Sequence, residues 1–423
     1  MIRTARRLDH IEPFYVMECA KAADVIAHSP ACDPARGGEP MIYLNIGEPD
    51  FTAPALVRDA AVACLDRGAT QYTHATGLPA LQRRIAAWYG TRFGLDIAPE
   101  RIVITAGASA ALQLACLALF EPGDDVLMPD PSYPCNRHFV AAAGATARLL
   151  PASAAARFQL DAASVAAAWA PATRGVLLAS PSNPTGTSIS PQAMADIVAA
   201  VRARGGVTIV DEIYLGLSYD DTYSHSALAL GEDVISINSF SKYFSMTGWR
   251  LGWMVLPPAL VGAVEKLAQN LYICPSSLAQ HAALACFEPE SLAEFERRRE
   301  EFRRRRDFIV PALQRLGFDV PVPPDGAFYV WADCSRFLDT QTLAAQTGGA
   351  GPANAWDFCF EMMRRAHVAL TPGRDFGPAL ADRFVRLSFA RALPELQAAV
   401  ARLARELSGT RNLHTAPHSH PAA

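Results

Sequence analysis

Polar side chains able to do chemistry follow directly after apolar runs of this sequence. In "TIVDEIYLG", Thr208 to Val210 are predicted to form a buried strand, and Asp211 comes at its end. A carboxylate in that position loses hydration unless it meets a cation, so we expect Asp211 to face one. Tyr214, three residues further on, brings a phenol to the same place. An acid after a strand also occurs in purely structural roles, so this stretch alone does not define a site.

A lysine stands in the stretch "NSFSKYFSMTGWRLGW", in a chain where lysine is scarce. Ser239 and Ser241 flank Lys242 with hydroxyl donors, and Arg250 adds a planar cation suited to phosphate. A lysine close to an arginine and to an apolar strand end has its ammonium form disfavoured, which makes it a candidate imine-forming amine. The alternative is an ordinary surface lysine on a loop, and the stretch taken alone is compatible with both.

Two further loops supply an anion-binding turn and a rigid amide. "TAGASAALQ" passes from a predicted strand into a helix at Gly107, Ala108 and Ser109, where backbone N–H groups and the helix dipole converge, an arrangement that favours phosphate. Glycine turns before helices are also common for structural reasons. In "SPSNPTG", proline and glycine fix the loop that carries Asn183, so its amide has a defined geometry.

The combined set matches the needs of one cofactor, pyridoxal 5′-phosphate. Its aldehyde requires the lysine, its phosphate requires the turn with serines and an arginine, its ring nitrogen requires the acid, and its phenolic oxygen requires neutral hydrogen-bond partners. No GxGxxG follows a predicted strand and no GxxxxGK[ST] is present, which argues against a dinucleotide site and a P-loop.

The elements that must position these residues are short apolar runs that end abruptly in polar or glycine residues. They are "RIVITAGAS", "DDVLMPDPSYP", "GVLLASPSNPTG", "VTIVDEIY" and "DVISINSFSK". Runs without alternation are typical of strands buried on both faces, and the Ala/Leu-rich segments between them suit crossover helices. The sequence predicts an α/β fold with a largely parallel sheet, whose strand ends converge on one site.

Residues 290–317 are predicted to form a long solvated helix, with Leu292, Phe295, Phe302 and Ile309 on one face. Its arginines could grip nucleic acid, but interleaved acids favour the connecting helix. A smaller α/β domain should follow, with strand-like pieces "GAFYVWADC" and "RFVRLSFA". The predicted organisation has four parts. They are an N-terminal arm with part of the small domain (1–45), a large cofactor-binding domain (46–289), the connecting helix with the C-terminal small domain (290–408), and a disordered tail (409–423).

Bulk properties exclude other classes of protein. The chain has 423 residues, 51% of them hydrophobic, and a formal net charge of −4, so no global field favours nucleic acid or a membrane surface. The uncharged stretch from Ile102 to Phe120 nearly reaches membrane-spanning length, but a buried strand, a turn and a buried helix explain it better. The cysteines lie in apolar surroundings without CxxC spacing, and the basic N-terminus meets an acid and a proline before any apolar run, both of which favour the cytosol.

At family level, the chain resembles the class I/II pyridoxal-phosphate-dependent aminotransferases of fold type I, in the aspartate-aminotransferase-like group. The matching motifs are "NIGEPDF", "QYTHATGLPALQ", "SNPTG", "DEIY", "SFSKYFSMTGWRLGW" and "VRLSFA", in family order over most of the chain. The resemblance implies a large domain with a mostly parallel seven-stranded sheet sandwiched by helices, a smaller α/β domain, and a homodimer with shared active sites.

The resemblance also implies roles for individual residues. Lys242 would form the internal aldimine, and Asp211 would keep the pyridine nitrogen protonated. Arg386 would clamp the substrate carboxylate beside Asn183 and the backbone of Gly47, although Gly47 also fits a plain turn glycine. The cofactor's phenolic oxygen, ring and phosphate would be contacted by Asn183, Tyr214, Tyr133, Ala108, Ser109, Ser239, Ser241, Arg250 and, from the neighbouring subunit, Tyr72.

The implied reaction moves an amino group from an L-amino acid to a 2-oxo acid by a ping-pong mechanism. Acid-specific relatives tend to carry a lysine in the helix-starting turn, whereas this chain has Gly107 to Ala110 there. This difference favours neutral or aromatic donors, with 2-oxoglutarate or pyruvate as acceptor, and leaves aspartate open. One alternative is a carbon–sulfur lyase or a synthase on the same scaffold. Another is a non-catalytic cofactor-binding regulator, but that class would need a DNA-binding region, for which the residues before Asn45 are too few. No metal site is predicted, and His414, His418 and His420 of the tail are expected to serve none.

Overall fold

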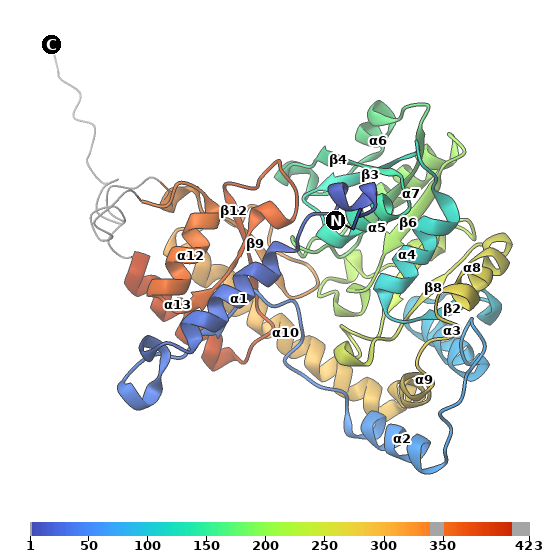
Figure 1. The fold of residues 1–423 in the computed structure, drawn as a ribbon, viewed down its shortest axis with the longest axis horizontal. Helices are drawn as coiled ribbons and strands as arrows, with labels where there is room; N and C mark the ends of the chain where they lie inside the picture. Colours follow the sequence, from blue (N-terminus) through green and yellow to red (C-terminus); the bar gives the residue numbers. More distant parts are fainter. Residues whose placement is uncertain (1, 339–350, 408–423) are drawn as a thin grey trace. The chain divides into compact units, whose positions relative to one another are not determined.

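The structure, a computed structural model, describes residues 2–338 and 351–407 (Figure 1). The chain divides into two compact units. The first comprises Met1–Pro13, Gly47–Arg304 and Val322–Tyr329, and the second Phe14–Ile46, Arg305–Pro321 and Val330–Ala423. The predicted tail and its histidines lie outside the described residues.

A seven-stranded sheet in the order β2-β8-β7-β6-β5-β3-β4 forms the centre of the first unit. The pairs β4–β3, β3–β5, β5–β6 and β6–β7 are parallel, whereas β8 is antiparallel to both of its neighbours, β7 and β2. The predicted, mostly parallel sheet is therefore confirmed, although β4 and β8 were not among the apolar runs found in the sequence. The strands are β2 (Ile102–Thr105), β3 (Asp125–Asp130), β4 (Thr146–Pro151), β5 (Thr173–Ala179), β6 (Val207–Asp211), β7 (Ile235–Ser239) and β8 (Gly252–Val255).

Apolar side chains cover both faces of this sheet, because its central strands are buried on both sides. Leu177 and Ile209 belong to a core that includes residues of α4, α5 and α8. Val176 and Val210, which alternate with them along the same strands, belong to a second core with α6 and α7. Each fully buried aliphatic side chain of this kind contributes about 1.5–3 kcal/mol. The covering helices are α4 (Ala108–Leu119), α5 (Pro134–Ala142), α6 (Ala162–Ala168), α7 (Pro191–Arg202) and α8 (Pro258–Leu271).

The uncharged stretch from Ile102 to Phe120 is the strand β2, a turn at Gly107 and the helix α4, as expected. In the described part of the chain, no helix combines the length and the apolar character that crossing a membrane requires. Local signals define other helix starts: Asp161 and Ser164 form a capping box at α6, and the Ser190 side chain accepts from Ala193 N at α7.

The long helix predicted after residue 289 is α10 (Pro289–Leu316). Phe295, Phe302 and Ile309 lie on its buried side, while Arg303 and Glu300 pair on its solvated side, so the predicted amphipathic pattern is confirmed. Three further helices precede α10 in the chain: α2 (Ala55–Asp66), α3 (Pro79–Phe93) and α9 (Ser277–Ala283).

The second unit contains two small sheets, of order β1-β10 and β11-β12-β9. Cys19 and Ala23 of α1, Met363 of α12 and Ala369 of β10 share one apolar core. The strands are β1 (Ile42–Tyr43), β9 (Tyr329–Asp333, of which Tyr329 is assigned to the first unit), β10 (Val368–Ala369), β11 (Thr371–Pro372) and β12 (Phe384–Ser388), and the helices are α1 (Tyr15–Ala27), α12 (Ala355–Arg365) and α13 (Leu393–Leu407).

Candidate functional site

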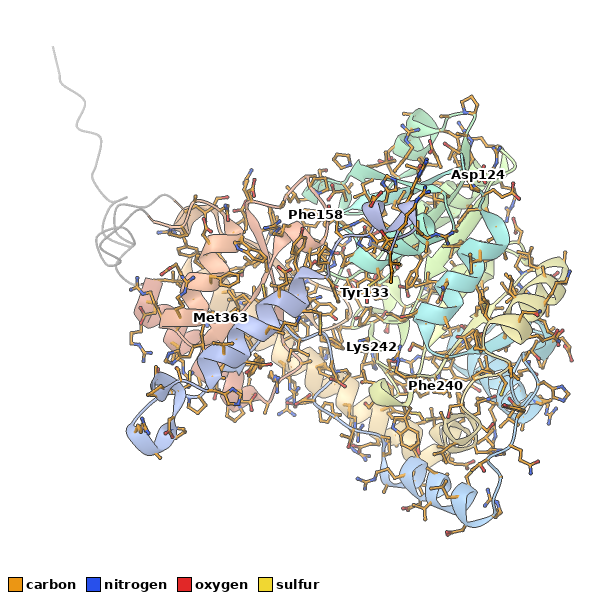
Figure 2. All side chains as sticks on the ribbon, viewed as in Figure 1. Asp124, Tyr133, Phe158, Phe240, Lys242 and Met363 are labelled. Carbon is orange, nitrogen blue, oxygen red and sulfur yellow. The ribbon has the colours of Figure 1, made fainter. Side chains whose placement is uncertain are left out.

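Lys242 follows the end of β7 and is held inside the first unit. Its Nζ donates a hydrogen bond to the carbonyl oxygen of Gly47 at 2.7 Å. The same nitrogen lies 5.7 Å from the ring centre of Tyr214 and 5.8 Å from that of Phe328. Phe240, fully buried two residues earlier, anchors the backbone that carries the lysine (Figure 2). The amine is therefore directed at an aromatic environment and a carbonyl group, unlike an ordinary surface lysine.

Asp211 ends β6, where its neighbours across the sheet are Ala179 of β5 and Ile237 of β7. It is 3% exposed, and its Oδ1 accepts a hydrogen bond from the backbone of Ile213 at 3.1 Å. Burial raises the pKa of this carboxyl to about 7, against the bond from Ile213 and the charge of Lys242, which lower it. A buried acid whose ionised form is disfavoured is stabilised by a nearby cation, so Asp211 fits a protonated ring nitrogen.

Glu212 is a second buried carboxyl, to which the sequence assigned no role. It accepts hydrogen bonds from Ser226 Oγ at 2.9 Å, Ser236 Oγ at 2.6 Å and Ala227 N at 2.7 Å. Burial raises its pKa, and these bonds oppose the shift. The three bonds fix the backbone next to Asp211. No sequence signal separated this residue from an acid facing solvent, because its partners come from distant positions in the chain.

An anion-binding cradle forms where β2 turns into α4. Gly107 has φ +82°, and a Cβ built on it would lie 2.6 Å from Arg250 Nη2, so only glycine leaves room for the guanidinium. Arg250 Nη1 lies 3.5 Å from Ser241 Oγ, and Ser241 N donates to Ser239 Oγ at 3.0 Å. The structure thus brings together the arginine, both serines and the turn.

The first turn of α4 completes this cradle with Ala108 and Ser109. Their backbone N–H groups belong to the end of the helix that carries the partial positive charge. A helix N-terminus, hydroxyl groups and a guanidinium together suit a phosphate group, so the residues present fit the phosphate of pyridoxal phosphate.

The predicted partners of the cofactor ring lie in the same unit. Tyr214 is 3% exposed, and its hydroxyl oxygen lies 2.8 Å from that of Tyr329. Asn183 is 6% exposed, on the loop that begins with Ser180, whose N–H donates to the carbonyl of Asp211 at 3.0 Å. This bond ties the amide-bearing loop to the strand that carries the acid.

Tyr133 directly precedes α5 and is labelled in Figure 2. Burial raises the pKa of its phenol well above the usual value, and Cys135, Tyr329 and Asp211 raise it further. Asp211 and Tyr329 are therefore part of the electrostatic surroundings of this phenol. Stacking of Tyr133 on the cofactor ring remains a prediction.

Gly47 has a steric reason to be glycine. A Cβ on this residue would lie 2.5 Å from the hydroxyl oxygen of Tyr329, closer than any real contact. Its carbonyl is also the acceptor for Lys242. Both observations concern packing around the lysine, and its part in substrate binding remains a prediction.

Arg386 belongs to the second unit, on β12 opposite Thr371 of β11. It is 2% exposed, and its Nη2 donates to the carbonyl of Asn45 at 2.7 Å and lies 3.4 Å from Thr371 Oγ1. The guanidinium carbon also lies 5.0 Å from the ring centre of Phe376. These contacts hold the guanidinium in one orientation, as binding a carboxylate with two parallel hydrogen bonds requires.

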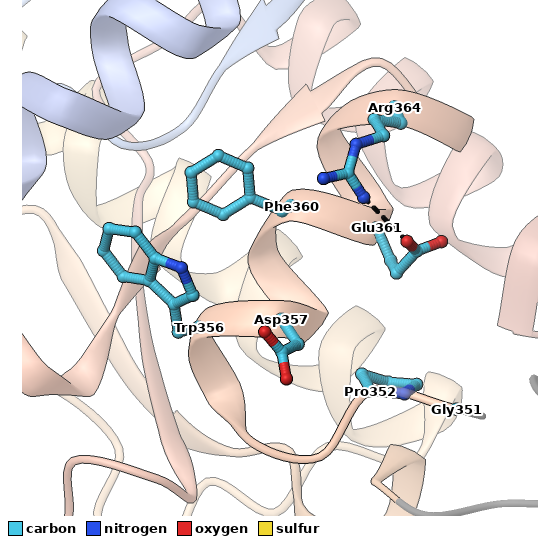
Figure 3. Close-up of a pocket in the computed structure, with 7 residues that line it drawn as sticks. All are labelled: Gly351, Pro352, Trp356, Asp357, Phe360, Glu361 and Arg364. Atoms are coloured by element: carbon cyan, nitrogen blue, oxygen red, sulfur yellow. Dashed lines mark hydrogen bonds and ion pairs between the residues drawn. The ribbon is translucent and has the colours of Figure 1, made fainter.

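Two further features are an exposed tyrosine and a hollow in the second unit. Tyr72, on the connection between α2 and α3, has 79% of its surface exposed within the single chain. A hollow of about 510 Å³ lies along α12 in the second unit, and none of the predicted site residues lines it (Figure 3). Its lining residues are Gly351, Pro352, Trp356, Asp357, Phe360, Glu361 and Arg364.

Comparison with known proteins supports one family. Residues 39–403 match the model of the family described as aminotransferase class I and II. A valine–pyruvate aminotransferase of Mycobacterium tuberculosis is 38% identical over 93% of this chain and 96% of its own length. An aspartate aminotransferase of Rhizobium meliloti is 34% identical over 87% of this chain and 89% of its own length.

Solved structures agree with this assignment. A crystal structure of an aminotransferase from Mycobacterium tuberculosis superposes with a TM-score of 0.88 at 37% identity, covering 96% of this chain and 100% of that one. The aspartate aminotransferase structure from Rhizobium meliloti gives a TM-score of 0.87 at 31% identity, covering 96% and 99%. The chain therefore belongs to the class I and II aminotransferases, pyridoxal-phosphate-dependent enzymes of fold type I that transfer amino groups between amino acids and 2-oxo acids.

Proposed function

We propose that this aminotransferase takes the amino group of a neutral L-amino acid, with aliphatic side chains preferred, and passes it to a small 2-oxo acid such as pyruvate. The likeness to the valine–pyruvate enzyme over 93% of the chain carries this proposal. The first turn of α4 agrees with it, because Ala108, Ser109 and Ala110 offer no cation to a side-chain carboxylate.

The site residues divide the work between holding the cofactor and moving a proton. The cradle around Gly107 and Arg250 would bind the phosphate, and Asp211 would pair with the ring nitrogen. The bound cofactor supplies a ring that accepts the electrons left behind when the substrate loses its α-proton. Lys242 Nζ would remove that proton as a general base, helped by the Gly47 carbonyl that fixes its position.

Arg386 would bind the substrate α-carboxylate through a charge-assisted pair of hydrogen bonds. Fixing the carboxylate restricts rotation of the substrate, and so decides which bond at the α-carbon is broken. Tyr214 and Asn183 would bond the phenolic oxygen of the cofactor. Their burial and the bond from Ser180 to the Asp211 carbonyl support a rigid arrangement.

We infer further that the enzyme is a cytosolic homodimer of amino-acid biosynthesis. All nine cysteines are free thiols, which suits a reducing compartment. Tyr72 and the apolar side chains Leu56, Val62 and Leu65 of α2 are exposed in the single chain, as a surface covered by a second copy requires.

A half-reaction screen tests the choice of donor. Each L-amino acid is added without oxo acid to the holoenzyme, and the decrease of the cofactor's visible absorption is followed. We expect faster reaction with valine, leucine and alanine than with aspartate or glutamate. A preference for the two acids would refute the neutral donor, and Lys242→Ala serves as the unreactive control.

A further inference from the structure

A buried pair of phenols lies beside Lys242, and only one of them has a predicted role. The hydroxyl oxygens of Tyr214 and Tyr329 are 2.8 Å apart, and their rings meet edge to face at 5.7 Å with an interplanar angle of 80°. Tyr329 is 1% exposed and begins β9. In "GAFYVWADC" it is an aromatic residue within an apolar strand, a pattern typical of core packing.

Several contacts fix the position of the Tyr329 hydroxyl. The Phe328 ring lies 4.8 Å from the Tyr329 ring and 5.5 Å from the Tyr214 ring. The absence of a side chain at Gly47 provides the space that the hydroxyl occupies. In the segment of residues 322–329, which ends in Tyr329, the N–H groups of Asp325 and Gly326 both donate to the carbonyl of Gly186, at 3.0 Å each.

This second set of bonds connects the pair to the loop that carries Asn183. Gly186 lies on that loop, so the segment that ends in Tyr329 is hydrogen-bonded to it. The two residues predicted to bond the phenolic oxygen, Tyr214 and Asn183, are therefore both held by residues 322–329. The titratable groups around the pair are Lys242, which lies near the Tyr214 ring, Tyr133, whose charge interacts with Tyr329 and Asp211, and Asp211, whose charge interacts with Lys242.

We propose that Tyr329 is a positioning residue, whose hydroxyl donates to Tyr214 and directs the Tyr214 proton toward the phenolic oxygen of the cofactor. The proposal rests on the proposed role of Tyr214. A phenol that accepts a hydrogen bond becomes a stronger donor, because bonds in a chain polarise one another. Without the Tyr329 hydroxyl, the Tyr214 hydroxyl no longer accepts this hydrogen bond. It therefore donates less strongly to the phenolic oxygen of the cofactor.

The substitution Tyr329→Phe removes the hydroxyl and keeps the ring. Donation from Tyr214 favours the anionic phenolic oxygen, so a weaker bond should raise the pH at which the visible absorption of the bound cofactor changes. We expect an upward shift of roughly 0.3–1 pH unit, the size of one neutral hydrogen bond or a fraction of it. The measurement is an absorption titration of the holoenzyme and requires no turnover.

A double-substitution comparison separates an effect through Tyr214 from a general one. Tyr214→Phe should shift the titration more than Tyr329→Phe, and adding Tyr329→Phe to it should cause no further shift. Tyr89→Phe is the matched control, since it removes another fully buried phenol hydroxyl, one bonded to Trp253 Nε1 at 3.2 Å. That variant should titrate as the unaltered enzyme does.

Each result has one meaning. An unchanged titration in Tyr329→Phe, or an equal shift when Tyr214 is already phenylalanine, overturns the proposal while the site stands. If Tyr214→Phe itself leaves the titration unchanged, the assignment of Tyr214 fails as well. Thermal unfolding of the cofactor-free variants identifies any variant that has lost its fold. The decisive comparison is then between Tyr214→Phe and Tyr214→Phe/Tyr329→Phe, which both keep the two aromatic rings.

Discussion

Asp211 shows how one residue links the chemistry to stability. In the cofactor-free protein, burial raises its pKa from 3.8 to about 7. Between these values the folded state holds a proton that the unfolded state has lost. The stabilising contribution of this group is therefore complete below about pH 4 and is lost as the pH rises through 7.

Asp211→Asn should remove the pH dependence of stability that this carboxyl imposes. The amide stays neutral and still accepts from Ile213 N, so the cofactor-free variant should be more stable than the unaltered protein at pH 8, by roughly 2–4 kcal/mol. That advantage should fall away between pH 7 and pH 4, as followed by thermal unfolding. Parallel pH profiles for the two proteins would contradict the assignment.

Asp233→Asn is the control of opposite sign. The hydrogen bond from Arg202 lowers the pKa of Asp233, so its contribution is present above its ordinary pKa and is lost in acid. Its substitution should therefore reduce stability at pH 8 and have no effect at the acid end of the profile.

Arg386→Ala should weaken catalysis with amino acids and spare substrates that lack a carboxylate. Removing one partner of a buried charge-assisted pair costs about 2–5 kcal/mol, which should appear in kcat/KM for valine or alanine. Primary amines of similar size should lose far less. Arg391→Ala, which removes a guanidinium bonded to the carbonyl of Tyr43, is the control. Equal losses for amines and amino acids would show that Arg386 serves only the fold.

Three of the residues that the sequence identified share one property, which Tyr329 lacks. Asp211, Asn183 and Lys242 lie at or shortly after strand ends, where a polar side chain after an apolar run stands out. Glu212 lies at the same strand end as Asp211, but its hydrogen bonds to Ser226 and Ser236 are not visible in the sequence. Tyr329 is hidden within an apolar strand, and its role depends on a contact with Tyr214, 115 positions away. Pairings at such separation are set by tertiary packing, which a single sequence does not record.

At the scale of elements, the turn from β2 into α4 provides a direct test of the phosphate cradle. Gly107→Ala places a Cβ 2.6 Å from Arg250 Nη2 and forces an alanine to φ +82°. We expect the affinity for pyridoxal phosphate to fall by about tenfold or more, because the guanidinium must move, at a cost on the order of 1–3 kcal/mol. The measurement is the dissociation constant from absorption titration of the cofactor-free protein.

Gly123→Ala is the matched control for that turn. Gly123 has φ +101° but has nothing within 4 Å of the added Cβ, so this variant carries the backbone strain without the collision. Its stability should fall while its affinity for the cofactor stays unchanged. An equal loss of affinity in both variants would attribute the effect of Gly107→Ala to strain alone.

Uninterrupted apolar runs decided which strands could be predicted. Such runs predicted β2, β3, β5, β6 and β7, and regular spacing predicted α10, whereas β4 has six residues but is only partly buried. The strand β8 has four residues, and its antiparallel direction depends on the turn before it, where Ser245 and Arg250 both have positive φ. Two-residue strands such as β10 and β11 carry no periodicity at all, so only their pairing in the folded unit defines them.

At the scale of the whole molecule, the exposed position of Tyr72 separates it from the other predicted phosphate ligands. The cradle around Arg250 is formed within one chain, whereas Tyr72 is 79% exposed on the connection between α2 and α3. Exposure of this aromatic residue, together with that of the apolar side chains of α2, is consistent with a surface shared by two copies. The proposed homodimer would supply Tyr72 to the site of its partner.

Mixing two defective chains tests this arrangement. Lys242→Ala removes the amine, and Tyr72→Ala removes the phenol that the partner would donate, so each homodimer lacks one group in both sites. In a mixed dimer, one site combines the intact Lys242 of one chain with the intact Tyr72 of the other, and the second site carries both defects. Random re-pairing of equal amounts should therefore restore about a quarter of the wild-type sites.

The control for mixing is one variant that carries both defects in the same chain, combined with the wild-type protein. Combining Lys242→Ala/Tyr72→Ala with the wild-type protein leaves every mixed dimer without a complete site, because each of its sites lacks one group. Activity of that mixture should fall on re-pairing, whereas activity of the first mixture should rise. No recovery in a mixed dimer verified by mass would mean that Tyr72 does not act across subunits, since the site of the Tyr72→Ala chain must regain its missing phenol when that chain pairs with the Lys242→Ala chain, which keeps Tyr72.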